Sequence, residues 1–198
     1  MGRRVVNVAI ASVGGQGGLT LSRVLAVAAV YDGLSVRTGE TLGMAQRFGS
    51  VVSYVRFGDS VLSPTFSEGE ADYLIGLELV EALRALRLLK PGGLALVANV
   101  VKPPISASLR KEELRAEALI EAISRYARTI QVPAAEIARS AGNPRAVNMV
   151  MLGVFASTSG ALSDSSIRRA IAEVVPARWV DSSLRAYELG RSFVRSSP

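Results

Sequence analysis

VVNVAIASVGGQGG, at residues 5–18, is a near-continuous apolar run that ends in a cluster of glycines. A run of this kind is typical of a strand buried on both faces of a parallel sheet. The Ala-rich segment Leu19–Tyr31 predicts a helix that ends near Gly33, and Leu34–Thr38 predicts a second strand. Together these segments predict a βαβ unit whose tight turn lies at Gly14–Gly18.

The rest of the chain also mixes strand and helix patterns. Further strands are predicted at residues 51–57, 73–77, 94–100 and 129–132, and helices at 78–89, 110–128, 133–142, 146–156 and 167–175. Lys90-Pro-Gly-Gly93 is expected to end the helix at 78–89, and Asp181 to cap a last helix. We predict one α/β, Rossmann-like domain over residues 1–198, with a mostly parallel sheet flanked by helices and a helical C-terminal third.

Cys and His are both absent from the 198 residues. Iron–sulfur clusters are held mainly by Cys thiolates, and zinc sites use Cys and His. We therefore expect this chain alone to bind no cluster, no metal and no cofactor. Any acid–base chemistry falls to Asp, Glu, Lys, Tyr or bound water, since the chain has neither a thiolate nor an imidazole.

The net charge of +6 comes mostly from arginine, because only three of the 23 Lys and Arg residues are Lys. The arginines are scattered, and the pairs Arg3-Arg4 and Arg168-Arg169 form no stripe. This distribution does not favour nucleic-acid binding, and an acidic protein partner explains the excess equally well.

No segment approaches the ~20 apolar residues of a membrane span. The N-terminus superficially resembles a signal peptide, but its apolar run is short and leads directly into the glycines, as a first strand would. We expect a cytoplasmic protein with no membrane contact.

The glycine cluster Gly14, Gly15, Gln16, Gly17 and Gly18 leaves three interpretations open. It partly matches the dinucleotide fingerprint G-x-G-x-x-G, with Ser12 in place of the first glycine and Glu40 about where a ribose-binding acid would lie. The glycines could instead serve only a tight turn and close packing. In the third interpretation, Gln16 and the open loop help to form a site shared with another subunit.

A second segment, Gly39–Gly58, joins a glycine-rich loop to an alternating strand pattern. Gln46 and Arg47 lie side by side in this loop, where the fold alone needs neither of them. Loops positioned by a rigid scaffold often carry binding residues. We therefore expect Gln46 and Arg47 to meet a ligand or partner.

Several motifs together resemble one family over nearly the whole chain. They are Val13-Gly-Gly-Gln-Gly17, Gly43-Met-Ala-Gln-Arg47, Gly49-Ser-Val-Val-Ser53, Val55-Arg-Phe-Gly58, Gly76-Leu-Glu78, Ser63-Pro64, Ala71-Asp72, Glu81-Ala-Leu-Arg84, and Gly142-Asn-Pro-Arg145 with Asn148 and Leu152-Gly153. This set resembles the small subunit of indolepyruvate ferredoxin oxidoreductase, the equivalent of the gamma domain of 2-oxoacid:ferredoxin oxidoreductases. Ser12, Phe48 and Leu77 depart from the family pattern, where Gly, Gly and Phe are usual.

The resemblance implies a subunit that is inactive alone. In the family, a large partner subunit carries thiamine diphosphate, Mg²⁺ and iron–sulfur clusters, decarboxylates an aryl pyruvate, reduces ferredoxin and forms an acyl-coenzyme A. The absence of Cys and His here agrees with that division of labour. The alternative is a stand-alone NAD(P)-binding oxidoreductase or sensor, and a third class is a basic structural or nucleic-acid-binding domain.

Site residues are expected in and around the two loops. Gln16 and the N–H groups of Gly14–Gly18 are candidates for an anionic oxygen of substrate or coenzyme A. Arg47 and Arg56 are candidates for a carboxylate or phosphate. Catalytic candidates are Arg47, Gln46 and Glu40, and binding candidates are Gly14, Gly15, Gln16, Gly17, Gly18, Ser50 and Arg56.

Glu78 and the 143–148 segment are ranked below these loops. Glu78 could bind substrate, but its place just after a strand favours stabilising a helix N-terminus. Asn143, Arg145 and Asn148 are expected to form a turn and a buried polar link.

Overall fold

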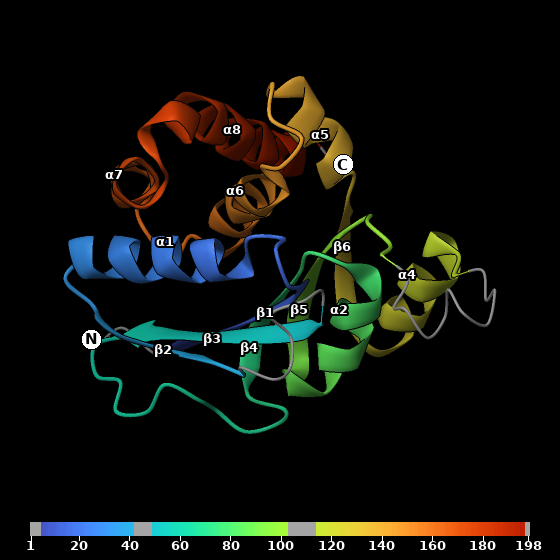
Figure 1. Cartoon of the computed structure of the whole chain (residues 1–198). Helices are drawn as coiled ribbons and strands as arrows, with labels where there is room; N and C mark the ends of the chain where they lie inside the picture. Colours follow the sequence, from blue (N-terminus) through green and yellow to red (C-terminus); the bar gives the residue numbers. More distant parts are fainter. Residues whose placement is uncertain (1–4, 42–48, 103–113, 197–198) are drawn as a thin grey trace.

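The structure, a computed structural model, describes residues 5–41, 49–102 and 114–196. A six-stranded mixed sheet forms its centre, in the order β2-β3-β1-β4-β5-β6 (Figure 1). The parallel block comprises β1 (Val6–Val13), β4 (Ala71–Gly76), β5 (Leu89–Ala98) and β6 (Arg128–Val132). The α/β class and the mostly parallel sheet predicted from the sequence are confirmed.

β3 (Ser50–Gly58) is the one antiparallel member among these described strands, and it lies between β1 and β2 (Ser35–Glu40). Val13 is opposite Ser50 and Asn7 is opposite Arg56. The start of β3 therefore lies beside the carboxyl end of β1, and the end of β3 lies beside the amino end of β1. The alternating pattern of residues 51–57 arises because Ser53, Val55 and Phe57 are buried under a helix, while their neighbours are half-buried.

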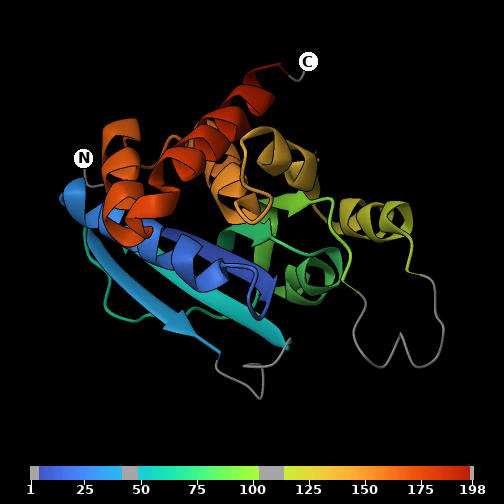
Figure 2. The same cartoon turned by 45° about the horizontal axis from the view of Figure 1, so that its top comes forward.

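Helices cover both faces of the sheet. On one face lie α1 (Gly18–Tyr31) and α6 (Val147–Ser159), with α5 (Ala134–Ser140), α7 (Asp164–Val174) and α8 (Val180–Ser196) packed around them (Figures 1 and 2). On the other face lie α2 (Leu79–Ala85) and α4 (Ala116–Tyr126). Short 3₁₀ turns, η1 (Leu86–Leu88) and η2 (Ala177–Trp179), precede β5 and α8. The helical C-terminal third is confirmed.

Most predicted elements are present, but three details are wrong. The helix expected at 78–89 ends at Ala85, and Lys90-Pro-Gly-Gly93 belongs to the first half of β5. Pro91 is exposed there, so its missing N–H removes no buried hydrogen bond. Asp181 lies inside the first turn of α8 and does not precede the helix as a cap.

The C-terminal helices pack unusually closely on each other where α6 crosses α8. A Cβ on Gly153 would lie 2.1 Å from the Tyr187 carbonyl oxygen, and one on Gly190 would lie 2.1 Å from the Val150 oxygen. Because both obstacles are backbone atoms, the crossing requires glycine on both helices. This contact joins α8 to the main hydrophobic core.

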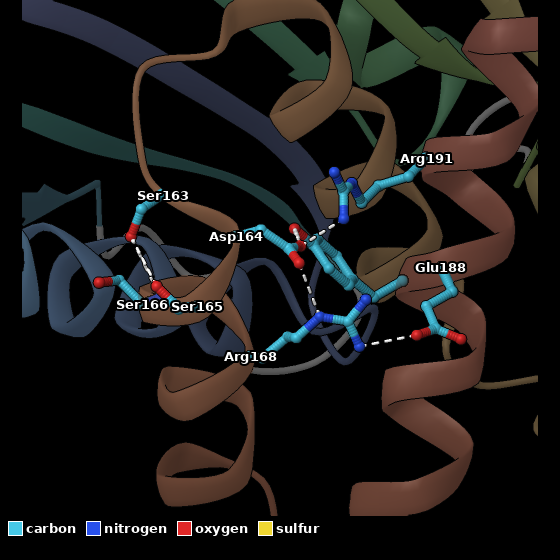
Figure 3. A network of polar contacts seen from close by, with 8 residues as sticks. Ser163, Asp164, Ser165, Ser166, Arg168, Glu188 and Arg191 are labelled. Carbon is cyan, nitrogen blue, oxygen red and sulfur yellow. Dashed lines mark hydrogen bonds and ion pairs between the residues drawn. The ribbon is translucent and has the colours of Figure 1, made fainter.

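A cluster of charged side chains fastens α7 to α8 (Figure 3). The Asp164 carboxylate accepts hydrogen bonds from Arg168 Nε at 2.8 Å, Tyr187 Oη at 2.8 Å and Arg191 at 2.5 Å. Arg168 also donates to Glu188 at 2.7 Å. We call these five residues the Asp164 cluster.

A second polar link fastens α7 to α1. Ser163 precedes α7 as its N-cap, accepting from the Ser166 N–H. The Asp32 carboxylate, just past the end of α1, accepts from the Ser163 N–H and from both serine hydroxyls.

Candidate functional site

The glycine turn of residues 14–18 lies at the point where the sheet connections change direction. From β1 the chain passes over one face through α1, whereas from β4 it passes over the other face through α2. In open α/β sheets, ligands bind in the crevice that forms at such a switch point, beyond the carboxyl ends of the strands. The topology therefore places the glycine turn where a ligand site is expected.

Gln16 holds this turn against the neighbouring strand. Its Oε1 accepts from the Val13 N–H at 2.8 Å, and its Nε2 donates to the Leu77 carbonyl at 3.3 Å. Leu77 follows β4 directly, so Gln16 links the two loops that meet at the switch point. The Nε2 group has a second hydrogen that these contacts leave available.

Gly17 shows why the turn needs glycine. Its φ of 84° is left-handed, and a Cβ there would lie 2.5 Å from Asn148 Nδ2. Asn148 donates instead to the Gly17 carbonyl at 3.1 Å, which ties the turn to α6. The Asn148 amide is thus the buried polar link that the sequence predicted for this segment.

The N-terminus of α1 opens beyond the turn without a side-chain cap. The first amide of the helix to bond within it is Leu21 N–H, to the Gly17 carbonyl at 3.0 Å. The preceding first-turn N–H groups have no intrahelical acceptor, and the helix dipole adds positive potential there. Such an end is favourable for an anionic group.

A cavity of about 750 Å³ adjoins this helix end. Its wall combines the glycine turn, the end of β5, the α5–α6 loop and the beginning of α8. The lining residues are Gly15, Gln16, Gly17, Thr20, Val100, Lys102, Ala135, Asn143, Pro144, Arg145, Ala146, Val147, Asn148, Met149, Val175, Trp179 and Ser183. We call it the switch-point cavity, and its size is typical of small-molecule sites.

The switch-point cavity has a cationic lining. Lys102 and Arg145 contribute positive side chains, and none of the described residues that line the cavity is Asp or Glu. Neither cation forms an ion pair with another residue in the described part of the chain. The cavity can therefore attract a carboxylate or phosphate.

A second hollow, of about 470 Å³, lies at the opposite edge of the sheet, against Val6, Phe57 and Leu162. Its ionisable lining residue is Asp32, whose carboxylate is already bonded to Ser163 and Ser166. This hollow therefore offers a ligand fewer available polar groups than the switch-point cavity does.

Glu78 has a structural role. It is fully buried, and its two carboxylate oxygens accept from the Glu81 N–H at 2.8 Å and the Lys102 N–H at 3.0 Å. The first contact caps α2, as the sequence favoured, and the second fixes the backbone of Lys102 beside the cavity. Because Glu78 is fully buried, a ligand in the cavity cannot reach its carboxylate.

The predicted site residues fall into separate places. Ser50 is exposed and lies opposite Val13, next to the glycine turn, where Gly14 N–H bonds to the Gly49 carbonyl at 2.9 Å. Glu40 ends β2 opposite Ser53 and is half-buried. Gln46 and Arg47 lie outside the described residues, so their predicted role stays a prediction.

Arg56 lies opposite Asn7, near the amino end of β1, whereas the glycine turn follows the carboxyl end of that strand. Its guanidinium donates to Asn7 Oδ1 at 2.9 Å, the Thr65 carbonyl at 2.9 Å and the Ser63 carbonyl at 3.2 Å. These bonds hold the 59–69 connection against β3. Six residues of strand, on the order of 20 Å, separate Arg56 from Ser50, so the two predicted binding residues do not converge.

The strand order bears on the dinucleotide alternative. In the dinucleotide-binding arrangement the strand carrying the ribose-binding acid is the direct neighbour of the first strand. Here β3 lies between β1 and β2, so Glu40 is two strand spacings, roughly 10 Å, from β1. This order disfavours the ribose contact that supported the alternative.

Trp179, Val175, Ser183 and Lys102 line the cavity but were not predicted as site residues. The first three come from the helical C-terminal third, more than 150 residues from the glycine turn, and no local motif links them to it. The one available signal was that Trp179 is the single tryptophan of the chain.

Two further findings limit the kinds of site. No three Cys, His, Asp or Glu side chains gather as a possible metal site within residues 5–41, 49–102 and 114–196. In those same ranges, no helix combines the length and apolarity that a membrane span requires.

Comparisons with known proteins agree with the fold and the motifs. The indolepyruvate oxidoreductase subunit IorB of Thermococcus kodakarensis is 38% identical over 191 residues, or 93% of each chain. The gamma subunit of a keto/oxoacid ferredoxin oxidoreductase from Geobacter sulfurreducens superposes with a TM-score of 0.73 at 22% identity, over 97% of this chain and 99% of that one.

A larger protein contains the same fold. The 2-oxoglutarate:ferredoxin oxidoreductase of Magnetococcus marinus, solved with 2-oxoglutarate, coenzyme A and succinyl-CoA bound, matches all of this chain with 32% of its own. The TM-score is 0.73 and the identity 17%, which shows a shared fold.

The family model described as pyruvate ferredoxin/flavodoxin oxidoreductase matches residues 7–193. That match spans both loops, the switch-point cavity and the C-terminal helices, and it confirms the resemblance found in the sequence motifs. The chain belongs to the pyruvate ferredoxin/flavodoxin oxidoreductase family.

Proposed function

We propose that this chain is the small subunit of an aryl-pyruvate, in particular indolepyruvate, ferredoxin oxidoreductase that forms acyl-coenzyme A. The observation that carries the proposal is the relationship to the IorB subunit over 93% of both chains. Residues 1–198 form one domain of this kind, in a cytoplasmic complex. A large partner subunit holds thiamine diphosphate, Mg²⁺ and the iron–sulfur clusters, and it passes electrons to ferredoxin.

The ligand inventory of the chain supports this division of labour. With no Cys and no His, the chain lacks the side chains that ordinarily hold clusters. Its own contribution is to bind and orient an anionic reactant.

The switch-point cavity is our proposed site for coenzyme A. Lys102, Arg145 and the uncapped first turn of α1 bring positive potential to one hollow, which suits a ligand with several phosphate oxygens. Gln16 keeps the turn in shape through its bonds to Val13 and Leu77. The cavity thus binds the co-substrate, while the chemistry takes place on the partner's cofactor.

Gln46 and Arg47 remain our candidates for the 2-oxoacid end of the reaction. A guanidinium binds a carboxylate through two parallel hydrogen bonds, which fixes the orientation of the acid. Arg47→Ala is expected to lower the activity of the complex at limiting indolepyruvate and to leave the chain folded. Glu40 and Ser50 are proposed to support this end through hydrogen bonds.

Reconstitution tests the proposal. The chain is co-expressed with the large subunit of an indolepyruvate ferredoxin oxidoreductase, and CoA-dependent reduction of ferredoxin is measured with indolepyruvate, phenylpyruvate, pyruvate and 2-oxoglutarate. We expect turnover only when both chains are present, and a preference for the aryl acids.

Two results would contradict the proposal. One is turnover by this chain alone. The other is tight NAD(P) binding in equilibrium dialysis, together with no effect of the chain on the activity of the large subunit.

A further inference from the structure

α1 is apolar on nearly every side, although one of its sides faces the solvent. Its sequence contains no Asp or Glu, and Arg23 is its only cation. The residues that pack on the sheet and on α6 and α7 are buried, whereas Leu19 is 43% exposed and Val30 is 60% exposed. A helix that is hydrophobic all round is ordinarily buried, so the solvent-facing side of α1 is unusual for a surface helix.

The solvent-facing residues of α1 form a straight stripe along the helix. They are spaced by four, three and four residues, which places them on one face. At 1.5 Å per residue the stripe is roughly 16 Å long. Figure 2 shows α1 at the outside of the helical layer, with α7 beside its C-terminal end. We call these four residues the α1 stripe: Leu19, Arg23, Ala26 and Val30.

The outer side of α4 gives a comparison within the same chain. Its exposed side chains include Glu117, Glu121 and Arg125, and the last two form an ion pair. Water solvates such charges, so the outer side of α4 is stable without a partner. The α1 stripe instead has one cation among apolar side chains, and an exposed surface of that kind marks a contact with another protein.

A second copy of this chain fits the α1 stripe poorly because Arg23 lies near the middle of the stripe. Two stripes packed antiparallel would bring the two Arg23 residues within roughly 5 Å of each other along the helix axes, and parallel packing would place them directly opposite. Arg23 forms no ion pair within residues 5–41, 49–102 and 114–196, so no described acid offsets this repulsion. The stripe therefore favours a different chain, with an apolar surface and a carboxylate opposite Arg23.

The α1 stripe begins beside the switch-point cavity. Thr20 lines the cavity, and its neighbour Leu19 is the first residue of the stripe. A protein that covers the stripe therefore also reaches the rim of the cavity. In the proposed function, the anionic reactant in the cavity has to meet the cofactor of the large subunit, so that subunit must lie against this rim.

We propose that the α1 stripe is the docking surface for the large partner subunit, which presents an apolar surface with an acidic side chain opposite Arg23. The inference rests on the proposed function, because that function supplies the partner. It goes further by naming the face of this chain that the partner covers and the chemistry by which the partner recognises it.

Cysteine labelling tests this proposal directly, because the chain has no Cys of its own. Ala26→Cys is labelled with a solvent-sensitive fluorophore before the large subunit is added. We expect a blue shift of the emission when the large subunit binds, because the label passes from water into an interface. The same label on Ala118→Cys, at an exposed position of α4, is the matched control and should not respond.

A charged variant of the stripe gives a second measurement. Val30→Glu is expected to raise the Kd for the large subunit on the order of tenfold or more, because it places a carboxylate in an apolar contact. Tyr126→Glu is the matched control, since Tyr126 is 81% exposed and lies in the last turn of α4, as Val30 does in α1. The Kd of that control should stay within about twofold of the parent value.

Arg23→Glu tests the acidic side chain of the partner. It should raise the Kd on the order of tenfold or more, because two carboxylates would then face each other, while Arg23→Lys retains most of the affinity. Equal affinity of the parent and Arg23→Glu would overturn the predicted carboxylate. Urea unfolding of each variant distinguishes lost binding from lost folding, and the labelled Ala26→Cys chain decides the matter if a charged variant fails to fold.

The outcomes separate this inference from the proposed function. An active complex with an unchanged Kd for Val30→Glu and no response from the label at position 26 would overturn the docking surface and leave the proposed function standing. A blue shift of the labelled chain alone, rising with its own concentration, would show that a second copy covers the stripe and would also overturn the inference. A parent chain that neither binds the large subunit nor supports its turnover would overturn both.

Discussion

Two regions of the molecule hold two cationic side chains each, the Asp164 cluster and the switch-point cavity, and they differ in how these charges are paired. In the Asp164 cluster, Arg168 and Arg191 donate to Asp164, and Arg168 also reaches Glu188. Lys102 and Arg145 line the cavity, and no Asp or Glu lines it within residues 5–41, 49–102 and 114–196.

This difference separates structural charge from functional charge. Burial alone would raise the pKa of Asp164, but hydrogen bonds from Arg168 and Tyr187 and the charge of Arg191 hold that pKa below its ordinary value. Hydrogen bonds to Asp164 and Glu188 in turn raise the pKa of Arg168 above its ordinary value. Charges matched within the fold contribute to stability, whereas unmatched cations beside a hollow are available to a ligand.

The largest effect is expected for Gly153→Ala, in the helical layer that contains the Asp164 cluster. Alanine normally stabilises a helix by about 1 kcal/mol relative to glycine. Here the added Cβ would lie 2.1 Å from the Tyr187 carbonyl, so α6 and α8 must separate. We expect a net loss of about 2–3 kcal/mol in the free energy of urea unfolding.

Ala118→Ser is the control for Gly153→Ala. Ala118 is exposed on α4, and its replacement should change the free energy of unfolding by less than about 0.5 kcal/mol. Equal stability of the Gly153→Ala and Ala118→Ser variants would mean that α6 and α8 are not in the close contact described.

The second-largest effect is expected for Arg145→Ala, which removes a cation from the lining of the cavity. Its guanidinium has no acidic partner among the cavity residues, so its loss should leave the unfolding free energy within about 0.5 kcal/mol of the parent. The KM of the complex for coenzyme A should rise about tenfold or more, because a charge-assisted contact is lost.

Arg139→Ala provides the matched comparison for Arg145→Ala. Arg139 is exposed in the last turn of α5 and does not line the cavity. A KM for coenzyme A that rises equally in both variants would point to long-range charge and remove the case for a specific contact. Steady-state kinetics and urea denaturation of the same preparations provide the data.

A smaller effect, dependent on pH, is expected for Asp164→Asn. Because contacts in the fold lower the pKa of Asp164, its stabilisation is fully present above the unfolded value of about 4 and is lost as the pH falls further. Asp164 is partly exposed, so solvent screening limits the loss in Asp164→Asn to about 1–2 kcal/mol at pH 7.

Urea unfolding at pH 7 and pH 3 checks the sign of this dependence. The difference between the parent and Asp164→Asn should shrink at pH 3. Asp59→Asn, at an exposed position, should track the parent at both values. A difference that widened at pH 3 would refute the assigned direction.

The sequence predicted most of the fold because its signals are local. The apolar run of β1, the glycines after it and the Ala-rich helix are adjacent in the chain, and they appear as predicted in β1 and α1. The end of α2 was wrong because Pro and Gly at 91–93 read as a helix stop. In the structure Leu89 and Leu94 pair with β4, and residues 91–93 lie in the irregular part of β5 between them.

The site was less accessible to prediction because it is assembled from distant segments. The glycine turn was recognised, but its cavity is completed by Lys102, Arg145 and Trp179, which three other loops deliver. Arg145 and Asn148 were expected to form a turn and a buried polar link. That was correct for the Asn148 amide, but the exposed guanidinium of Arg145 could be separated from it only in three dimensions.

Arg56→Ala should give the smallest effect. It tests whether a cation whose hydrogen bonds are made within the fold is structural, at a residue that the sequence predicted to be part of the site. The three acceptors of its guanidinium are neutral and partly exposed, so we expect a loss of about 1 kcal/mol in unfolding free energy. The KM values of the complex for coenzyme A and indolepyruvate should be unchanged, because Arg56 lies at the opposite edge of the sheet from the cavity. Arg37→Ala is the matched control, since Arg37 is the cross-strand neighbour of Arg56 and its guanidinium donates to the adjacent Val36 carbonyl. A raised KM for either substrate in Arg56→Ala alone would restore Arg56 to the site and show that a residue with partners inside the fold can also serve a ligand.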